Sequence, residues 1–415
     1  MKVLKIATAG SVDDGKSTLI GRLLHDTGSL AEDQLEAIRQ SSERKGYDYL
    51  DFSLATDGLV AEREQGITID VAHIYFSTQT TSYIIADTPG HVEYTRNMVT
   101  GASTSQAAII LIDARKGVVE QTYRHFFING LLRVREVVVA INKMDLVDFD
   151  QEVFEGIKAA FEELTRKSPF PEQRITFLPI SALQGDNVVH PSGRLPWYTG
   201  PTLLEHLESL DPAGFTETGP VRFPVQWVIR PKTADFPDFR GYAGKVYGGT
   251  LKAGDAVMLL PSGNCSKIRD IFFFDAPLEA ATPGSSVTLT LEDDLQLSRG
   301  DMIVKLGEAP RAERELSATL CWMDHKPLKE GARFTLQHHA HKVLSRVTSI
   351  ESRLSTDFSG GTSADGGLHL NEVGEVRLEL AREVYTDPYR EHRENGFFIL
   401  IDPLTRHTAA VGFIS

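Results

Sequence analysis

The sequence predicts an α/β domain with a mostly parallel sheet, followed by two β-barrel domains. Strand and helix patterns alternate from residue 1 to about 210, and short β runs broken by glycine turns fill the rest. The chain has 415 residues, which is too many for one ordinary hydrophobic core. We therefore expect three domains, at residues 1–212, 213–310 and 311–415.

In the first domain, continuous apolar runs predict strands that are covered on both faces. These runs are "VLKIATA" (3–9), "AAIILIDA" (107–114), "EVVVAINKMD" (136–145) and "ITFLPISAL" (175–183), with a hairpin at "AHIYFST" (72–78) and "SYIIADT" (82–88). Helical patterns lie between them, including "KSTLIGRLLHD" (16–26) and "VFEGIKAAFEELTRK" (153–167). Gly28 is placed to end the first of these helices.

The later domains are marked by linkers and by a change of pattern. "DPAGFTETGP" (211–220) has the composition of a linker, and "GEAPRAER" (307–314) is expected to be a second one. The β runs between them are "RFPVQWVIR" (222–230), "GYAGKVYGGTLKAGDAVMLLPSG" (241–263) and "GSSVTLTL" (284–291), which predict a barrel ending near Val304. From Glu315, "LSATLCWMD", "ARFTLQHHAHKVLSRVTSI", "EVRLELA" and "FFILID" predict a second barrel.

Composition narrows the class of protein. The formal net charge of −14 argues against a chain that acts on nucleic acid, which usually carries a basic surface. Cys265 and Cys321 are far apart in the sequence, which favours a reducing compartment over a disulfide scaffold. The start of the chain leaves no room for a signal peptide, and no apolar run is long enough to span a bilayer. We expect a cytoplasmic protein with no nucleic-acid or membrane partner.

The stretch "GSVDDGKS" directly after the first strand fits the phosphate-loop pattern G-x-x-x-x-G-K-[ST]. Its glycines let backbone N–H groups surround phosphates, Lys16 supplies a cation, and the Ser17 hydroxyl is a candidate Mg²⁺ ligand. A chance glycine-rich turn is the alternative, but the strand before and the helix after favour phosphate binding. The candidate contacts are Gly10, Ser11, Val12, Asp13, Asp14, Gly15, Lys16, Ser17 and Thr18.

Three further motifs follow in order and predict guanine recognition. The first is "DTPGH", in which Asp87 is expected to hold a Mg²⁺-bound water and the Gly90 amide to contact the γ-phosphate. The second is "NKMD", with Asn142, Lys143 and Asp145, and the third is "SAL", with Ser181, Ala182 and Leu183. The Asp145 carboxylate accepts from N1–H and the exocyclic amine of guanine, and the "SAL" backbone contacts the guanine oxygen. Adenine offers no matching pair of donors, and each unpaired buried group costs about 1–3 kcal/mol. We therefore expect GTP and Mg²⁺ rather than ATP.

"REQGITID" (63–70) lies between the phosphate loop and Asp87. Thr68 is the candidate second protein ligand of Mg²⁺, in a switch that senses the γ-phosphate. The alternative is a strand start with β-branched residues, and only the neighbouring motifs favour the switch.

The set "DGKS", "REQGITID", "DTPGH", "NKMD" and "SAL" resembles GTPases related to translation elongation factor Tu, in which a P-loop GTPase domain precedes two β-barrels. Longer strings resemble one branch, the large GTP-hydrolysing subunits of bacterial sulfate adenylyltransferase (ATP sulfurylase). Selective ones are "DFRGYAG" (238–244), "PWYTGPTLLEHLE" (196–208) and "LSRGD" (297–301). The likeness covers the first domain and the first barrel and is weaker in the second barrel.

This resemblance implies that GTP hydrolysis drives formation of adenosine 5′-phosphosulfate from ATP and sulfate. The adenylylation itself would belong to a small catalytic subunit resembling ATP pyrophosphatases, within a hetero-oligomer. By the same resemblance His91 orients the attacking water, and capping of the next helix is the alternative role. Arg63 and Arg96 are possible arginine fingers, but salt-bridged or solvated arginines are favoured, so we expect slow hydrolysis that the partner stimulates.

Two other functions stay open from the residues alone: an elongation factor-like carrier of aminoacyl-tRNA, and a stand-alone GTPase switch.

The histidines of "QHHAHK" (337–342) are expected on a surface strand, where alternation puts His339 and His341 on one face. The lack of further ligands nearby argues against a metal site. The aromatic run "IFFFD" (271–275) is expected in a barrel core, with a partner-binding patch as the alternative.

Overall fold

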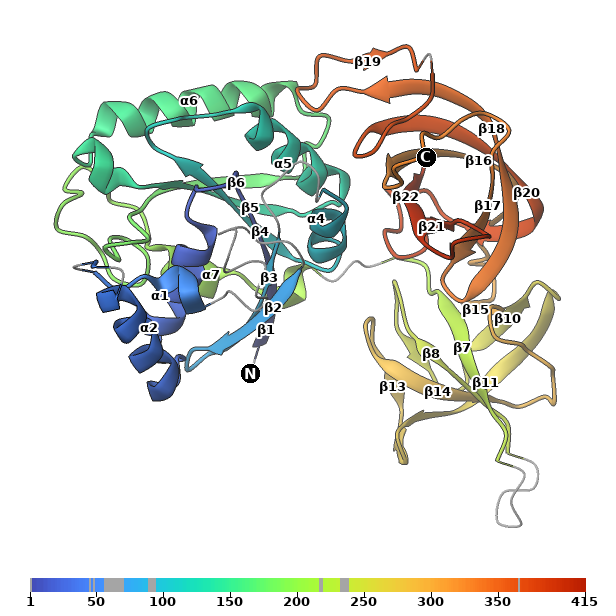
Figure 1. The fold of residues 1–415 in the computed structure, drawn as a ribbon. Coiled ribbons are helices and arrows are strands. Elements are labelled where there is room, and N and C mark those ends of the chain that lie inside the picture. Colours follow the sequence, from blue (N-terminus) through green and yellow to red (C-terminus); the bar gives the residue numbers. More distant parts are fainter. Residues whose placement is uncertain are drawn as a thin grey trace. The chain divides into compact units, whose positions relative to one another are not determined.

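The computed structural model of the chain describes residues 2–44, 46–47, 49–55, 71–88, 95–215, 219–231, 239–364 and 366–415. They form two compact units (Figure 1). The first comprises Met1–Phe215 with Ser355–Gly360, and the second comprises Thr216–Leu354 with Gly361–Ser415. No helix in the described ranges combines the length and apolar composition needed to cross a membrane.

The first unit is built on a six-stranded sheet in the order β2-β3-β1-β4-β5-β6. The strands are β1 Lys2–Ala9, β2 Ala72–Ser77, β3 Thr81–Asp87, β4 Ala107–Asp113, β5 Glu136–Asn142 and β6 Arg174–Pro179. Only the β2–β3 pair is antiparallel, and β1, β3, β4, β5 and β6 run parallel. The predicted α/β domain with a mostly parallel sheet is therefore confirmed.

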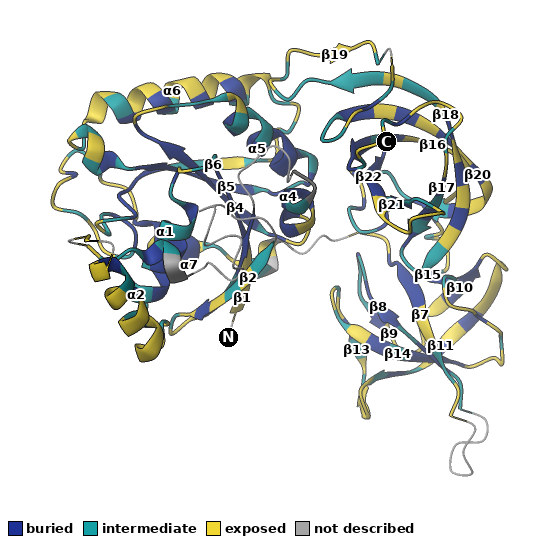
Figure 2. Ribbon diagram, viewed as in Figure 1, coloured by how far each residue is buried: buried dark blue, intermediate teal, exposed yellow. Residues whose placement is uncertain are grey.

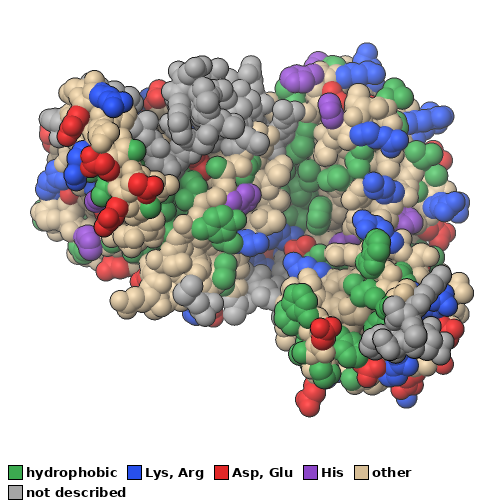
Figure 3. Space-filling model, turned by 60° about the horizontal axis from the view of Figure 1, so that its bottom comes forward, with side chains coloured by type: hydrophobic (Ala, Val, Ile, Leu, Met, Phe, Trp, Pro, Cys, Tyr) green, Lys and Arg blue, Asp and Glu red, His purple; other side chains and the backbone are tan. Residues whose placement is uncertain are grey.

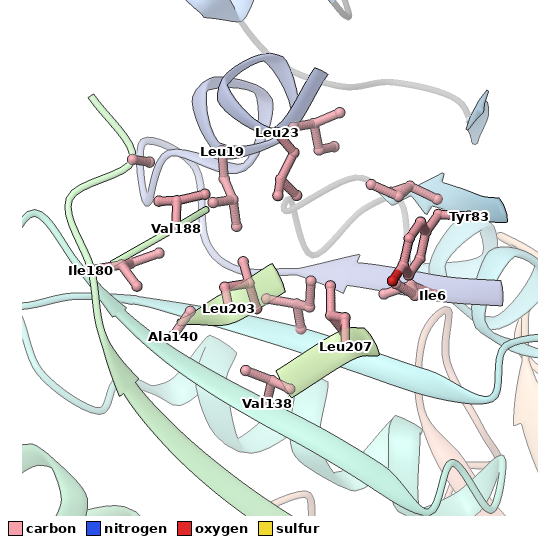
Figure 4. Close-up of a cluster of buried hydrophobic side chains, with 14 of the residues drawn as sticks. Ile6, Leu19, Leu23, Tyr83, Val138, Ala140, Ile180, Val188, Leu203 and Leu207 are labelled. Atoms are coloured by element: carbon pink, nitrogen blue, oxygen red, sulfur yellow. The ribbon is translucent and has the colours of Figure 1, made fainter. Parts of the chain in front are cut away.

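Helices flank this sheet on both sides (Figure 1). They are α1 Lys16–Asp26, α2 Glu32–Arg44, α4 Thr95–Ala102, α5 Glu120–Leu131, α6 Gln151–Lys167 and α7 Leu203–Ser209, with 3-10 turns η1 Phe52–Ala55, η3 Met144–Val147 and η4 Pro212–Phe215. On one face, leucines of α1 and α7 pack against alternate residues of β1 and β5 (Figure 4). On the other, Phe126 of α5 lies 5.1 Å from Phe161 of α6, ring centre to ring centre.

The strand order places the phosphate loop at a reversal in the sheet. Strand β1 is hydrogen-bonded to β3 on one side and to β4 on the other. The connection that follows β1 and the connection that follows β3 therefore lead to opposite sides of β1. In open α/β sheets, ligands bind at such a switch point because the loops separate there. The loop between β1 and α1 lies at this edge, together with the residues that follow β3, β5 and β6.

Helix α1 ends as the sequence predicts, at Asp26, and Gly28 adopts a left-handed φ of 68°. The Gly28 N–H donates to the His25 carbonyl at 3.0 Å, and the Ser29 N–H donates to the Leu24 carbonyl at 2.8 Å. This pair of bonds is a Schellman motif, which satisfies carbonyls that the end of a helix leaves open.

The second unit contains two closed barrels, each formed by six strands of a seven-stranded sheet. The first has the order β10-β15-β7-β8-β14-β11-β12 and closes through β10–β11. Its strands are β7 Phe223–Ile229, β8 Gly241–Lys245, β10 Ala256–Leu260, β11 Asn264–Phe273, β12 Ala276–Leu278, β14 Ser286–Leu291 and β15 Met302–Lys305, and β9 Leu251–Lys252 and β13 Ala280–Ala281 pair separately.

The second barrel has the order β17-β21-β22-β16-β20-β18-β19 and closes through β17–β18. Its strands are β16 Arg311–Trp322, β17 Arg333–His338, β18 His341–Leu354, β19 Gly361–Thr362, β20 Val373–Thr386, β21 Phe397–Ile401 and β22 Thr408–Ile414. Buried and exposed residues alternate along β18 and β20, as expected for barrel strands with one inner and one outer face (Figure 2). The prediction of two barrels after the α/β domain is confirmed.

The structure corrects the expectation for the linker at 307–314. β16 begins at Arg311, so only the first half of that segment is outside a strand. Arg311 and Glu313 pair with β20 residues, and Arg311 is exposed to solvent, where a charge needs no buried partner. Charge content alone therefore does not distinguish an exposed strand from a linker.

The histidine segment also differs from expectation. His338 ends β17 and His341 begins β18, and the two residues pair across the hairpin, so His339 lies in the turn with a φ of 50°. The prediction that His339 and His341 share one face of a strand is wrong, because the chain reverses between them. No group of three or more metal-binding side chains occurs among the described residues.

The core prediction for "IFFFD" holds only in part. Ile271 is buried, but Phe273 and Phe274 are 48% and 84% exposed. They lie at the β11–β12 turn, where the strand leaves the barrel wall. Hydrophobic side chains are visible on the surface of the second unit (Figure 3).

Candidate functional site

The phosphate loop forms a concave backbone at the start of α1. Asp13 and Gly15 both have left-handed backbone angles, with φ of 68° and 94°. Left-handed residues within a turn direct successive N–H groups to one side, which makes a nest for an anion. No side chain caps α1, so its first N–H groups face the same concavity.

Glycine is required at position 15 for two reasons. Its φ of 94° is unfavourable for other residues, and a Cβ there would lie 2.5 Å from Asn142 Nδ2. The loop therefore packs directly on the residue that ends β5. This contact brings together two motifs that are more than a hundred residues apart in the sequence.

Lys16 folds back over the loop that precedes it. Its Nζ donates to the Gly10 carbonyl at 2.8 Å and to the Ser11 carbonyl at 3.3 Å, and the residue is 8% exposed. Burial lowers the pKa of Lys16, and the nearby Asp87 and Asp14 carboxylates oppose that shift. A phosphate at this position would favour the charged amine further.

Asp87 is buried at the end of β3, where the Thr8 hydroxyl donates to its Oδ1 at 3.0 Å. Thr8 lies on the neighbouring strand β1. This bond orients the carboxylate at the carboxyl edge of the sheet, on the same side as the phosphate loop.

Asn142 connects the phosphate loop to the loop after β6. Its Nδ2 donates to the Asp14 carbonyl at 2.8 Å, and its Oδ1 accepts from the Ala182 N–H at 2.9 Å. Both polar atoms of one buried amide are thus used to hold two loops in a fixed relation. The role of Asn142 as a nucleotide contact stays a prediction, and the structure adds this bridging geometry.

Asp145 supplies a test of whether the site fits guanine. Its Oδ1 is buried and has no hydrogen-bond partner among the described residues. A buried carboxylate oxygen without a donor is costly, so this position is suited to a ligand that brings donors. The N1–H and exocyclic amine of guanine are such donors. The phosphate loop offers a second open group, the buried Ser11 hydroxyl.

The "SAL" loop presents one free backbone donor. Ser181 and Ala182 are buried, and the Ala182 N–H is occupied by Asn142. The Ser181 hydroxyl accepts from the Gln184 N–H at 3.2 Å, which closes the turn. The Leu183 N–H has no partner among the residues that the structure describes. It is therefore a backbone donor that is available to a ligand.

An ion-pair cluster that sequence reasoning missed lies beside these loops. The Asp113 carboxylate accepts from Arg115 Nη2 at 2.6 Å and from Lys143 Nζ at 3.0 Å. Burial raises the pKa of Asp113, but the hydrogen bonds from Arg115 and Lys143 outweigh it and hold the pKa well below its usual range. Lys143 Nζ also bonds the Asp13 carbonyl. Asp113 ends β4 as Asp87 ends β3, and this common position was the available signal.

Several predicted residues lie outside the described residues, namely Arg63, Thr68, Gly90 and His91. Arg96 falls at the start of α4, and its side chain is likewise not described. The described part of the chain brings together the phosphate loop, Asp87, Asn142, Lys143, Asp145 and the "SAL" turn at one edge of the sheet.

The sequence of the chain is similar to those of known GTP-binding proteins. Residues 1–213 match the elongation factor Tu GTP binding domain family, and residues 315–415 match the GTP-eEF1A C-terminal domain-like family. Sulfate adenylyltransferase subunit 1 of Bacteroides fragilis is 48% identical over 99% of this chain and 86% of that protein. The Aeromonas hydrophila subunit 1 is 49% identical over the same shares.

The bifunctional enzyme CysN/CysC of Mycobacterium tuberculosis is 48% identical over 99% of this chain and 67% of that protein. The similarity therefore extends through the GTP-binding domain and both barrels, in relatives with different total lengths. The chain belongs to the sulfate adenylyltransferase subunit 1 family, within the elongation factor Tu-like GTPases.

Proposed function

We propose that this chain is the GTPase subunit of a sulfate adenylyltransferase. Hydrolysis of GTP drives a partner catalytic subunit to form adenosine 5′-phosphosulfate and pyrophosphate from ATP and sulfate. The observation that supports this most is the 48% identity to subunit 1 over nearly the whole chain, combined with an open guanine-type acceptor at Asp145. That identity favours sulfate activation over the aminoacyl-tRNA carrier and over a stand-alone switch.

In this proposal the phosphate loop, residues 10–18, holds the GTP phosphates through its backbone N–H groups and Lys16. Asp145 and the "SAL" turn bind the guanine base, and Asn142 holds the phosphate loop and the "SAL" turn in a fixed relative position. Ser17 and Thr68 would hold Mg²⁺, and Asp87 would accept a hydrogen bond from water bound to it. When bound, Mg²⁺ neutralises phosphate charge. The Gly90 amide senses the γ-phosphate.

The partner in this proposal is a small subunit resembling ATP pyrophosphatases, and the two proteins act as a hetero-oligomer in the cytoplasm. GTP favours one conformation of the complex only through its differential affinity for the two states. The domain limits 1–212, 213–310 and 311–415 remain our proposed boundaries. The first would then bind the nucleotide, and the partner would respond to its state.

His91 is the proposed group that orients the attacking water. Replacing it by alanine should slow GTP hydrolysis by roughly 10²–10⁴-fold, the usual contribution of a positioned general base, and leave GTP affinity within about twofold. Single-turnover hydrolysis and equilibrium binding of a non-hydrolysable analogue measure the two quantities separately. Equal loss of both would contradict the role.

The isolated chain should hydrolyse GTP slowly, because no arginine finger is assigned in it.

The decisive experiment measures adenosine 5′-phosphosulfate formation from ATP and sulfate. It compares this chain alone, the small subunit alone and both proteins, each with GTP and with a non-hydrolysable analogue. We expect product beyond the equilibrium with ATP alone only when both proteins and hydrolysable GTP are present. If GTP is hydrolysed but product formation never depends on it, the assignment to sulfate activation is wrong.

A further inference from the structure

Arg22, on the second turn of α1, contacts the loop after β6 that carries the "SAL" motif. Its Nε donates to the Ala182 carbonyl at 3.2 Å, and its Nη2 donates to the Leu183 carbonyl. The guanidinium also lies against Gly185, where an added Cβ would be 3.4 Å from Nη1. One side chain therefore contacts three residues of the turn that follows β6.

The other side of the guanidinium rests on an aromatic ring. The Arg22 Cζ lies 4.5 Å from the centre of the Phe52 ring, and Phe52 is only 1% exposed. His25, one turn along α1, packs on the same ring at 4.8 Å between ring centres. Asp26 completes the surroundings, with its Oδ1 3.4 Å from Arg22 Nη1.

Phe52 can approach α1 because Gly21 has no side chain. A Cβ on Gly21 would lie 2.2 Å from the Phe52 carbonyl oxygen and 2.8 Å from its Cβ. The helix backbone and the η1 turn are therefore in direct contact. Arg22 is held between this turn and the "SAL" loop.

The bond to the Ala182 carbonyl has a geometric consequence for the next N–H. Ala182 C=O and Leu183 N–H belong to one planar trans peptide, in which they point in opposite directions. A guanidinium that fixes the carbonyl toward α1 therefore aims the Leu183 N–H away from α1. The Leu183 N–H has no partner among the described residues.

We propose that Arg22 is a positioning residue for guanine recognition and that the Phe52 ring, which stacks on its guanidinium, holds it in place. It touches neither the base nor the phosphates in this scheme and acts by orienting the Leu183 peptide. The inference rests on the proposed use of GTP, and it assigns the selectivity for the oxygen at position 6 of the base to a residue outside the nucleotide-binding motifs.

The test measures equilibrium binding of three diphosphates to the full chain at pH 7. GDP carries all guanine groups, inosine diphosphate lacks the amine read by Asp145, and 6-thioguanosine diphosphate replaces the oxygen by sulfur, a weaker acceptor. For Arg22→Gln we expect the ratio of 6-thioguanosine diphosphate Kd to GDP Kd to fall by about fivefold, the value of one neutral hydrogen bond. The ratio for inosine diphosphate should stay within twofold of the wild-type ratio.

Two further variants keep the proposal testable if Arg22→Gln does not fold. Arg22→Lys retains a donor for one carbonyl but not the fork, so its sulfur-to-oxygen ratio should fall between those of wild type and Arg22→Gln. Phe52→Leu should lower the same ratio, because the guanidinium loses its flat support. The matched control is Arg39→Gln on α2, where the Arg39 side chain is 55% exposed and forms an ion pair with Glu36.

The outcomes separate the inference from the function beneath it. If Arg22→Gln leaves both ratios unchanged, or weakens all three diphosphates in parallel, Arg22 has only a structural role and the proposal is wrong. An unchanged ratio in Phe52→Leu would remove Phe52 from the scheme. If the wild-type chain does not bind GDP, the proposed function itself fails.

Discussion

A single carboxylate, that of Asp145, is expected to set the choice of base. Its buried Oδ1 has no donor among the described residues, which suits a ligand that brings donors. The substitution Asp145→Asn replaces one acceptor oxygen by an NH₂ donor. We expect GDP affinity to fall by about a hundredfold, because two pairings worth roughly 1–3 kcal/mol each are disturbed. Xanthosine diphosphate, which carries an oxygen in place of the amine, should bind this variant better than wild type.

Isothermal titration with both diphosphates measures the exchange. Asp148→Asn is the matched control, since Asp148 is exposed and lies three residues along the same segment. Its left-handed φ of 52° is one that asparagine adopts readily. Unchanged GDP affinity in Asp145→Asn would exclude the carboxylate from base recognition.

Gly15 offers a second prediction about one residue. Gly15→Ala combines a left-handed φ of 94° with a Cβ 2.5 Å from Asn142 Nδ2, so the loop and the amide cannot both keep their places. We expect GDP affinity to fall at least tenfold, as read by fluorescent-nucleotide titration. Gly28→Ala isolates the backbone effect, because Gly28 has a φ of 68° but open space around it. That control should cost about 1 kcal/mol of stability and leave affinity unchanged.

At the scale of residues, the sequence predicted contacts that depend on a local pattern. Lys16 and Asn142 stand in short motifs whose chemistry is fixed by spacing, and the structure places both at the same edge of the sheet. Arg22 could not be identified in this way, because its partners lie about 160 residues further along the chain. Its place on a helix face indicates nothing until the loop after β6 is folded against it.

At the scale of elements, the buried parallel strands were predictable because both faces are apolar over a continuous run. Barrel strands were less so. β22 is "TAAVGFI", and its small residues give a weak pattern, yet it pairs with β16 and β21. The β17–β18 reversal at His339 was missed because no Asn-Gly or Gly-rich pair marks it. Pairing with the distant strand β16 defines β22, whereas the β17–β18 reversal is a local hairpin without a marked turn sequence.

Helix α7 illustrates how few bonds can hold a short element. The Thr202 hydroxyl accepts from the Glu205 N–H at 3.2 Å, and Glu205 Oε2 accepts from the Thr202 N–H at 2.8 Å. Thr202→Ala should lower the local stability of α7 by about 1 kcal/mol, because the Glu205 N–H loses its acceptor, whereas the Leu203 and Leu204 N–H groups keep the Asn187 and Val188 carbonyls.

Hydrogen exchange of the α7 amides reports this local free energy. Thr202→Ser keeps the hydroxyl and should leave the exchange rates close to wild type. Leu203 and Leu207 bury against the sheet in either variant, so the fold should persist. If Thr202→Ala exchanges like wild type, core packing alone holds the helix.

At the scale of the whole molecule, the second unit contains a buried polar network. Arg222 Nε and Asp387 Oδ2 are 2.7 Å apart, and Asn395 Nδ2 donates to the same carboxylate at 2.7 Å. His338 Nε2 lies 2.9 Å from the Asn395 carbonyl oxygen, and His339 Nε2 lies 3.1 Å from Asn395 Oδ1. Both rings donate to Asn395, which favours their protonated forms, but burial is the larger effect on the pKa of each ring and favours the neutral form.

Burial lowers the pKa of His338 to about 4, from 6.5. Between these values the unfolded chain binds a proton that the folded chain does not, so the free energy of unfolding falls as pH falls. For His338 alone the loss between pH 7 and 5.5 is about 1 kcal/mol. His339, whose pKa burial also lowers, adds in the same direction. Above pH 7 this contribution is fully present.

Urea unfolding at several pH values tests this, followed by the fluorescence of buried Trp322 in a Trp197→Phe, Trp227→Phe background. His338→Gln keeps a donor for Asn395 without a titrating ring, so its loss from pH 7 to 5.5 should be smaller than the wild-type loss by about 1 kcal/mol. Exposed His407→Gln is the control and should follow wild type. Equal slopes in all three proteins would rule out His338 as a source of acid sensitivity.

The Asn142 amide bonds the Asp14 carbonyl on one side and the Ala182 N–H on the other, which has a consequence for how the base and the phosphates of a nucleoside diphosphate bind together. Ordering either loop around its own fragment would partly order the other, so the cost in conformational entropy is met once for the whole ligand. Guanosine and pyrophosphate offered separately should then bind with free energies that sum to less than that of GDP, and each fragment should strengthen the binding of the other.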